Sequence, residues 1–364
     1  MKLSFLVPLT FFAVAPFLLA AQVPPYYSGV DFTLEGDLLK NELSDLIIET
    51  HINLIPYTSN STDTWDVLRQ SDSEPNNSNN VVLIYGYNDT DNVSINDRTR
   101  DIYDSCHGGS CIGLWNREHV FAKSLANPNL YTDEPGPGTD VHNLRAVDSQ
   151  KNSQRNNRFF AFGTATSGLV DIDGEPICDD PGCFYPGDEF KGDVARIIMY
   201  MYLRYPTQCE PVNIGVGSSS DASNGDMPNL FLEWNNEDPV SDFERNRNDV
   251  IYYYQGNRNP FIDNPYLASM IWNGPQTEDT WGVLSAEDLA AQKLFIYPSL
   301  TTDYLFIEGP DISKGQLSII NQLGQTLDFE LNANRIDVSG FSNGLYFVRI
   351  KLAGSSRLFK FLVY

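Results

Sequence analysis

Two of the chain's four histidines lie in polar segments rich in groups that can hold a metal ion or a phosphate. The first segment spans residues 116–119 (Asn-Arg-Glu-His), and the second spans residues 140–158. A histidine of ordinary pKa, about 6.5, can take a proton from water near pH 7. Mg²⁺ prefers oxygen ligands, keeps several waters and often takes only one or two protein groups. These residue types therefore suit metal-assisted hydrolysis of a phosphodiester.

Each segment supplies side chains for a stated part of that reaction. His119 is available as the general base that deprotonates water, and Glu118 and Asn152 are available as oxygen ligands of the metal. Arg155 and Arg158 follow on the same segment, and a guanidinium group can hold a phosphate through two hydrogen bonds. We expect the cation to be Mg²⁺, with Mn²⁺ or Ca²⁺ as alternatives.

Other motifs for catalysis do not account for the sequence. The His-Glu-x-x-His pattern of zinc enzymes is absent, and so are the glycine motifs of nucleotide-binding loops. Residues 340–344 (Gly-Phe-Ser-Asn-Gly) match the nucleophile pattern of hydrolases, but a strand-like run follows them where that motif needs a helix. We interpret this segment as a hairpin turn, because Asn343 and Gly344 both tolerate positive φ.

The two segments impose a condition on the local fold. Glu118 and His119 are adjacent, and adjacent side chains of a regular strand face opposite sides. The strand must therefore end, bulge or twist there if both residues serve one site. Asp148 or Ser149 is placed to cap a helix that carries Asn152. The sequence predicts a strand, a loop and then this helix, which together form the site.

The rest of the chain predicts an α+β fold, a mixed body of helices and strands followed by a small all-β sandwich tail. Apolar spacing predicts helices at 36–51, 188–205, 242–254 and 264–272, and a short strand at 81–85. From about residue 293 short strand-like runs dominate, at 294–297, 304–307, 317–321, 335–338 and 345–351.

The N-terminus and the cysteines indicate an exported protein. Residues 3–21 are apolar apart from one serine and one threonine, and they follow Lys2, which predicts a signal peptide over 1–21. A retained membrane anchor is the alternative. In an exported protein, the pairs Cys106/Cys111 and Cys178/Cys183 favour two local disulfides over a four-cysteine zinc site. Cys209 is left as a free thiol or as an exchange partner for either pair.

The net charge argues against a polyanionic partner. The chain carries 48 acidic and 24 basic residues, a formal charge of −24. Residues 141–160 hold four bases and one acid, a net charge of +3, which predicts a local basic patch. We hypothesise that divalent cations also neutralise part of the surrounding negative field.

In the order of its motifs, the chain resembles the bacterial endonuclease I family, secreted or periplasmic nucleases with a ββα-metal active site. The resemblance covers about residues 25–275. The matching segments are 25–27 (Pro-Tyr-Tyr), 116–120 (Asn-Arg-Glu-His-Val), 140–145 (Asp-Val-His-Asn-Leu-Arg), 152–157 (Asn-Ser-Gln-Arg-Asn-Asn), 237–241 (Glu-Asp-Pro-Val-Ser) and 257–263 (Asn-Arg-Asn-Pro-Phe-Ile-Asp).

This resemblance implies His119 as general base, Glu118 and Asn152 as metal ligands, and His142 and Asn116 as supporting residues. It implies cleavage of DNA and RNA to 5′-phosphate products with little sequence preference. Some relatives hold the scissile phosphate with an arginine between the two histidines, and this chain has none there. Lys123, Arg145 or Arg155 would take that role. The phosphate and substrate contacts that we expect are Arg117, Arg145, Arg155 and Arg158. Gln150 stands where many relatives have glutamate.

The C-terminal segment resembles the sorting domain of the type IX secretion system of Bacteroidetes. The matching stretches are 295–299 (Phe-Ile-Tyr-Pro-Ser), 320–324 (Ile-Asn-Gln-Leu-Gly), 342–347 (Ser-Asn-Gly-Leu-Tyr-Phe) and the terminal Lys-Phe at 360–361. The resemblance implies an address read by the secretion machinery, and a carbohydrate-binding or adhesive domain is the alternative. We therefore predict a signal peptide (1–21), a nuclease domain (22–280), a linker (281–292) and a sorting domain (293–364).

The sequence thus predicts a secreted or cell-surface, metal-dependent and largely sequence-nonspecific endonuclease, which acts as a monomer. Its substrates would be DNA and RNA, and no membrane span remains once the signal peptide is cleaved. The alternative from another class is an inactive extracellular binding or adhesion protein on a nuclease fold. A phosphodiesterase for small nucleotides, or for RNA alone, is an enzymatic alternative.

Overall fold

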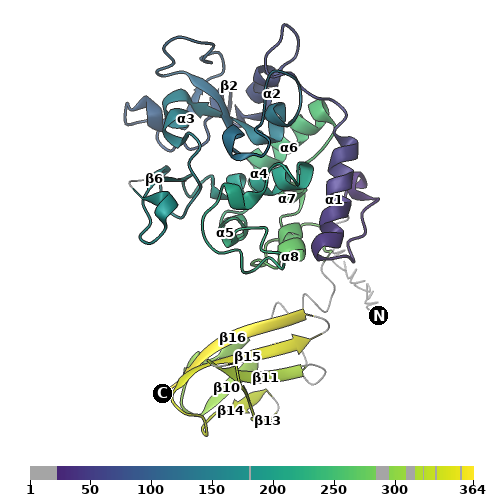
Figure 1. Ribbon diagram of the computed structural model, residues 1–364, viewed down its shortest axis with the longest axis vertical. Helices are drawn as coiled ribbons and strands as arrows, with labels where there is room; N and C mark the ends of the chain where they lie inside the picture. The colour runs from purple at the N-terminus through teal and green to yellow at the C-terminus, as the bar shows by residue number, and fades with distance from the viewer. Residues whose placement is uncertain are drawn as a thin grey trace, which may run out of the picture. The chain divides into compact units, whose positions relative to one another are not determined.

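The computed structural model describes residues 23–179, 182–283, 295–308, 316–322, 324–332, 334–352 and 355–364. The chain divides into two compact units, Met1–Trp281 and Gly282–Tyr364 (Figure 1). The predicted signal peptide and most of the predicted linker lie outside the described residues. The α+β fold class predicted from the sequence is confirmed: a mixed unit is followed by an all-β unit.

The first unit combines helices with three small antiparallel sheets. Its helices are α1 (Gly36–Thr50), α2 (Thr64–Ser71), α3 (Ser149–Arg155), α4 (Lys191–Arg204), α5 (Asn229–Glu237), α6 (Asp242–Gln255), α7 (Pro260–Asp263) and α8 (Tyr266–Trp272). Its strands are β1 (Ser73–Glu74), β2 (Asn77–Val82) and β3 (Thr99–Asp101), β4 (Trp115–His119) with β5 (Leu144–Asp148), and β6 (Gly168–Val170) with β7 (Cys183–Tyr185).

Helix α4 lies at the centre of the helical part, where it packs against α1, α5 and α7 (Figure 1). Every residue from Gly192 to Leu203 is buried, including the charged Asp193 and Arg196, so α4 is enclosed by protein on all sides. The helices predicted at 36–51, 188–205 and 242–254 are confirmed to within a few residues at their ends. The helix predicted at 264–272 begins at Tyr266, after Pro265 and the separate short α7.

Strand β2 begins earlier and ends earlier than the sequence predicts. It spans Asn77–Val82, whereas the apolar run continues to Tyr85. Leu83 to Tyr85 are fully buried but leave the strand, and Tyr85 adopts a left-handed φ of 72°. Burial therefore explains the apolar run, and the turn at Tyr85 explains why the strand does not follow it.

A network of buried ion pairs holds β5 against the helices. The Asp72 carboxylate accepts from Arg247 Nε at 2.9 Å and Arg145 Nε at 3.3 Å, and Arg145 Nη1 lies 2.6 Å from Asp193. Arg145 is 1% exposed. Its guanidinium is neutralised by two carboxylates inside the protein, so the phosphate contact predicted for Arg145 does not fit the structure.

A second buried network surrounds Asp140. Tyr200 and Tyr205 donate to its Oδ2 at 2.8 and 3.0 Å, and His51 Nδ1 lies 3.7 Å from the same oxygen. His142 packs on Tyr200 with ring centroids 4.3 Å apart, and its Nε2 lies 3.3 Å from the Asn257 carbonyl oxygen. His142 therefore supports the fold around the loop before β5.

This network predicts that the protein loses stability in mild acid. Burial lowers the pKa of His142 to about 3 and also lowers the pKa of His51. Below the unfolded pKa of about 6.5 the unfolded chain binds the extra protons, so the free energy of unfolding falls as pH falls. For His142 alone we expect a loss of about 2 kcal/mol between pH 7 and pH 5. Urea unfolding at both pH values should show that His142→Gln loses less stability than the wild type, and equal losses would contradict this.

The second unit consists of two antiparallel sheets, apart from one parallel pair between β9 and β16. One sheet has the order β13 (Glu330–Asn332), β14 (Arg335–Asp337), β10 (Tyr304–Glu308) and β8 (Phe295–Tyr297). The other has the order β12 (Thr326–Leu327), β11 (Gln316–Asn321), β15 (Gly344–Leu352), β16 (Ser355–Val363) and β9 (Leu300–Thr301). Both sheets contribute to one apolar core, so the predicted β-sandwich is confirmed. Strand β15 begins at Gly344, so residues 340–344 are a turn and not a catalytic motif. They join β14 of one sheet to β15 of the other, however, so the predicted hairpin pairing is not present.

Candidate active site

Strands β4 and β5 and helix α3 follow one another in the order strand, loop, strand, helix. The two strands pair in a continuous register from Trp115 opposite Asp148 to His119 opposite Leu144. Helix α3 begins at Ser149, directly after β5, and the Asp148 carboxylate accepts from the backbone of Gln150 and Lys151 at 2.8 and 2.9 Å. The cap predicted for this helix is confirmed. Strand β4 ends at His119. An end of the strand at this point is one of the three arrangements that would let the adjacent Glu118 and His119 serve one site.

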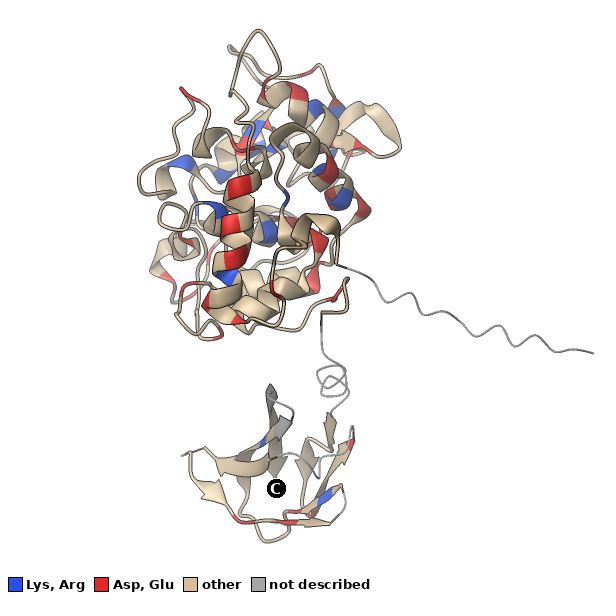
Figure 2. Ribbon diagram, turned by 90° about the vertical axis from the view of Figure 1, so that its right-hand side faces the viewer, with Lys and Arg blue, Asp and Glu red and all other residues tan. Residues whose placement is uncertain are grey.

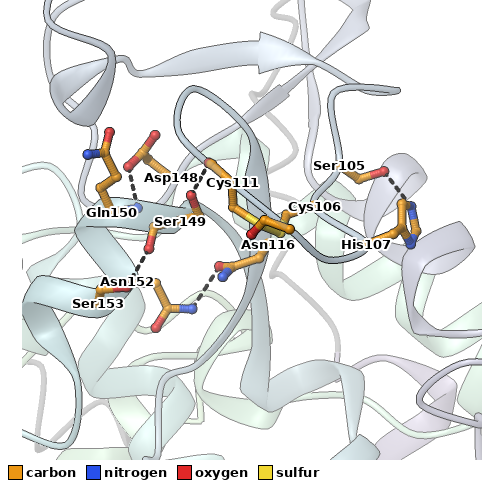
Figure 3. The surroundings of a disulfide bond; sticks show 11 residues. Ser105, Cys106, His107, Cys111, Asn116, Asp148, Ser149, Gln150, Asn152 and Ser153 are labelled. Carbon is orange, nitrogen blue, oxygen red and sulfur yellow. Dashed lines mark hydrogen bonds between the residues drawn. A yellow bond between two sulfur atoms is a disulfide. The ribbon is translucent and has the colours of Figure 1, made fainter.

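Asn152 lies on the face of α3 that contacts β4. Its Nδ2 donates to Asn116 Oδ1 at 2.8 Å and lies 3.4 Å from the Arg117 carbonyl oxygen (Figure 3). Because that carbonyl can only accept, the NH₂ group must face β4, and Oδ1 is the end of the amide left to ligate a cation. Asn116 and Glu118 are two residues apart in β4 and share one face of the strand. The structure therefore brings Asn116 and Asn152 together, and it places Glu118 on the same face of β4 as Asn116.

The Glu118 carboxylate is buried beside one hydroxyl and one guanidinium group. It is 1% exposed, it accepts from Tyr85 Oη at 3.0 Å, and Arg155 Nη1 lies 3.3 Å from its Oε1. Burial raises the pKa of Glu118 to about 7, although Arg155 and Tyr85 both act to lower it. The negative charge is thus only partly compensated, and a divalent cation would favour the ionised form. An under-compensated carboxylate next to a free amide oxygen fits Mg²⁺.

Arg155 holds the end of β4 in place. It is fully buried, and it donates to the carbonyl oxygens of His119 at 3.2 Å and Val120 at 2.8 Å. Its guanidinium also stacks on Phe160, 4.6 Å from the ring centre. All of these contacts are internal, so the structure gives Arg155 a positioning role in place of the predicted phosphate contact.

His119 is held by a backbone carbonyl group. Its Nε2 lies 2.8 Å from the Gly138 carbonyl oxygen, and its ring lies beside Tyr57 with centroids 5.7 Å apart. Because the carbonyl only accepts, Nε2 carries the proton and Nδ1 carries the lone pair. Burial lowers the pKa of His119 to about 3, and the charges of Lys123, Arg117 and Arg155 lower it further. The imidazole is therefore neutral at pH 7, with Nδ1 as its acceptor atom, but its pKa lies well below the ordinary value of about 6.5 that we expected for the general base from the sequence.

Gly138 and Tyr85 are site residues that sequence reasoning missed. A Cβ atom on Gly138 would lie 2.0 Å from the Tyr131 carbonyl oxygen, so only glycine fits there. The residue acts through its backbone, which gives no motif of its own. Tyr85 stood out only as the end of an apolar run, and its hydroxyl reaches Glu118 across 33 sequence positions. The pattern of residues 136–138 (Gly-Pro-Gly) was the one local signal of a tight turn.

The remaining predicted arginines lie at the edges of the site. Arg117 is half-buried between two rings, 3.4 Å from the centre of Tyr57 and 4.0 Å from that of Trp65. Arg158 is half-buried beyond the end of α3, where its Nη1 donates to the Gln154 carbonyl oxygen at 2.7 Å. Neither forms an ion pair with a carboxylate among the described residues.

The basic patch predicted over residues 141–160 is not present on the surface. Arg145, Lys151 and Arg155 are each 3% exposed or less, and Arg158 alone of the four bases remains half-buried. Figure 2 shows acidic positions scattered over several helices and loops of this unit. The positive charges of this segment thus take part in internal contacts. The prediction was wrong because the net charge of a segment does not show which of its side chains are buried.

Both predicted disulfides are present, Cys106–Cys111 and Cys178–Cys183, and Cys209 is a buried free thiol. The loop closed by Cys106–Cys111 contacts both elements of the site. The Cys106 amide donates to the Trp115 carbonyl oxygen at 2.7 Å, and Ser149 Oγ donates to the Cys111 carbonyl oxygen (Figure 3). This loop therefore connects the start of β4 with the start of α3.

Removal of this disulfide should weaken activity as well as stability. For Cys106→Ser with Cys111→Ser we expect a loss of about 2 kcal/mol in unfolding free energy. We also expect a several-fold lower kcat, because Asn116 and Asn152 lose a common support. The matched control is Cys178→Ser with Cys183→Ser, which opens a loop of the same length at the start of β7. Equal activity of the two double variants would contradict this role.

Two family models match the chain. The endonuclease I model matches residues 35–266, and the model of the secretion system C-terminal sorting domain matches residues 295–364. The chain therefore belongs to the endonuclease I family and ends in a sorting domain, as both resemblances implied. It is a nuclease that is secreted or displayed at the cell surface.

Two curated relatives are similar over most of the nuclease unit. An extracellular ribonuclease of Bacillus subtilis (strain 168) is 37% identical over 270 residues, which cover 71% of this chain and 82% of the relative. An extracellular ribonuclease of Bacillus amyloliquefaciens is 36% identical over 249 residues, which cover 65% of this chain and 74% of the relative. Among the described residues, no helix is long and apolar enough to cross a membrane.

Proposed function

We propose that the protein is a divalent-metal-dependent, largely sequence-nonspecific endonuclease that cleaves RNA and DNA to 5′-phosphate products. The observation that carries this proposal is the packing of Asn152 of α3 against β4, the strand that carries Glu118 and ends at His119. The names of the two relatives support RNA as a substrate.

In this proposal each residue acts through the atom that the structure leaves available. Glu118 and the Asn152 amide oxygen would hold Mg²⁺, with Mn²⁺ or Ca²⁺ as alternatives. The cation would stabilise charge on the phosphate and on the departing 3′ oxygen. His119 Nδ1 takes the proton of the attacking water, while the Gly138 carbonyl oxygen fixes the ring through Nε2. Arg155 and Tyr85 hold the Glu118 carboxylate in position.

Lys123 is the proposed phosphate contact in place of the missing arginine. Of the three candidates, Arg145 and Arg155 are buried in internal contacts, whereas Lys123 is exposed in the loop after β4. Its charge also acts on His119, which places it near the site. We expect Lys123→Ala to lower kcat/KM about tenfold, the size expected for one lost hydrogen bond to a charged group. Lys191→Ala, which removes an ion pair with Glu237 on α5, is the control and should leave kcat/KM unchanged.

The alternative class is an inactive extracellular binding or adhesion protein on a nuclease fold. A binding module has no need of a carboxylate, an amide oxygen and a neutral histidine at one strand end. The acidity of the surface remains an obstacle to polyanion binding, and we propose that divalent cations reduce it. The C-terminal unit is proposed as the segment that the secretion machinery recognises, and the nuclease as a monomer.

The test is digestion of plasmid DNA and structured RNA by the purified protein, with EDTA and after return of Mg²⁺, Mn²⁺ or Ca²⁺. We expect cleavage that stops with EDTA and products whose 5′ ends accept a ligase without phosphorylation. Products that require a kinase before ligation would contradict the proposed bond cleavage. Absence of cleavage with every cation would favour the binding-protein alternative.

A further inference from the structure

An open hollow of about 500 Å³ lies beside helix α2, outside the residues discussed above. Its lining includes Asp66, Arg69 and Gln70 of α2, together with Ile102 and Tyr103 that follow β3. Tyr103 is 77% exposed, although it is a large aromatic side chain. An exposed ring beside hydrogen-bonding groups is the kind of surface on which proteins stack single bases.

The polar groups of the hollow are fixed in a donor and acceptor pattern. Arg69 Nε donates to the Ile102 carbonyl oxygen at 3.2 Å, and Arg69 Nη1 lies 3.3 Å from the Asp66 carboxylate. Gln70 Nε2 donates to Tyr254 Oη at 2.6 Å. Asp66 compensates the charge of Arg69, which disfavours a phosphate here. A carboxylate, a guanidinium and an amide together match the edge of an uncharged nucleobase.

A continuous row of contacts leads from this hollow to His119. Arg69 Nη2 donates to Ser105 Oγ at 3.1 Å, and that hydroxyl lies 2.9 Å from His107 Nε2. The His107 ring packs on Trp65, with centroids 4.8 Å apart.

Trp65 in turn packs on Arg117 at 4.0 Å, Arg117 stacks on Tyr57 at 3.4 Å, and Tyr57 lies beside His119. The hollow is lined in part by α2, and these contacts connect α2 to β4, the strand that ends at His119. Residues 107–110, which follow Ser105 in this row of contacts, are exposed to solvent.

We propose that this hollow is a subsite for one unpaired nucleobase of the strand being cleaved, stacked on Tyr103 and bonded by Asp66 and Arg69. The inference rests on the proposed nuclease function and adds a preference to it. A base inside a duplex presents neither its face nor its pairing edge, so the subsite favours single-stranded substrates.

The test compares Tyr103→Ala, Tyr103→Phe and Tyr253→Ala in the full chain. Tyr253 is 80% exposed in the same unit and does not line the hollow, so it is the matched control. Substrates are a 20-nucleotide single-stranded RNA and its duplex. We expect Tyr103→Ala to raise KM for the single strand about tenfold with kcat unchanged, as stacking of one base predicts. Tyr103→Phe should retain the wild-type KM, because the ring remains.

Binding of the same labelled RNA in EDTA, followed by fluorescence anisotropy, separates this subsite from the proposed catalysis. Weaker single-strand binding by Tyr103→Ala alone would support the subsite even if no cleavage were seen. Unchanged binding and KM in Tyr103→Ala would overturn the proposal. An equal effect of Tyr253→Ala, or an equal loss on the duplex, would overturn it as well.

Discussion

Replacement of His119 by alanine is expected to lower kcat by about 10²–10⁴-fold, the contribution of a positioned general base. The neutral imidazole at the end of β4 is held through Nε2 by the Gly138 carbonyl oxygen, so Nδ1 alone is oriented for proton transfer. The other three histidines have contacts elsewhere: His142 is buried on Tyr200, His51 is buried beside Asp140, and the His107 ring packs on Trp65. The measurement is the initial rate of RNA cleavage at saturating substrate and Mg²⁺.

Two controls make the His119 result specific. Far-ultraviolet circular dichroism and urea unfolding should show that His119→Ala folds, because the strand and its register do not depend on this side chain. Retained binding of RNA in EDTA should show that the surface is intact. A variant that folds and keeps more than about a tenth of the wild-type kcat would show that His119 is not the base.

Glu118→Gln is the second variant for which we expect a large effect. The substitution keeps size and can still accept from Tyr85 Oη, but it removes the buried negative charge that would hold a divalent cation. We expect at least a hundredfold lower rate at millimolar Mg²⁺, with part of the loss recovered at higher Mg²⁺. The measurement is the rate as a function of Mg²⁺ concentration.

The matched control for Glu118→Gln is Glu49→Gln. Glu49 is exposed on α1 and its substitution changes the net charge by the same amount. A shared shift of the Mg²⁺ dependence in both variants would attribute the effect to the overall field of the protein. An unchanged Mg²⁺ dependence in Glu118→Gln would remove Glu118 from the metal site.

Local sequence signals were sufficient for part of the site. The capping role of Asp148 and the amphipathic α1 follow from neighbours within a few positions, whereas strand β5 between the loop and α3 was not predicted. Because helix caps and apolar periodicity act over one or two turns, a single sequence shows them directly.

The partners of the arginines could not be predicted in the same way. Arg145 pairs with Asp72 and Asp193, which lie 73 and 48 positions away in the chain. Arg155 bonds the carbonyl oxygens of β4, which have no signature in the sequence. A single sequence does not distinguish an arginine that becomes fully buried from one that stays exposed to solvent. We therefore predicted a phosphate-binding patch where the folded protein has arginines in internal ion pairs and hydrogen bonds.

The central claim is that Glu118 and Asn152 hold one divalent cation beside His119. Binding of Mn²⁺, counted by electron paramagnetic resonance, tests it without reliance on turnover. We predict that the wild type and His119→Ala each bind one more Mn²⁺ ion per molecule than Glu118→Gln or Asn152→Ala. Weaker binding of Mn²⁺ to the acidic surface should be the same in all four proteins. Equal Mn²⁺ binding by the wild type and Glu118→Gln would contradict the account.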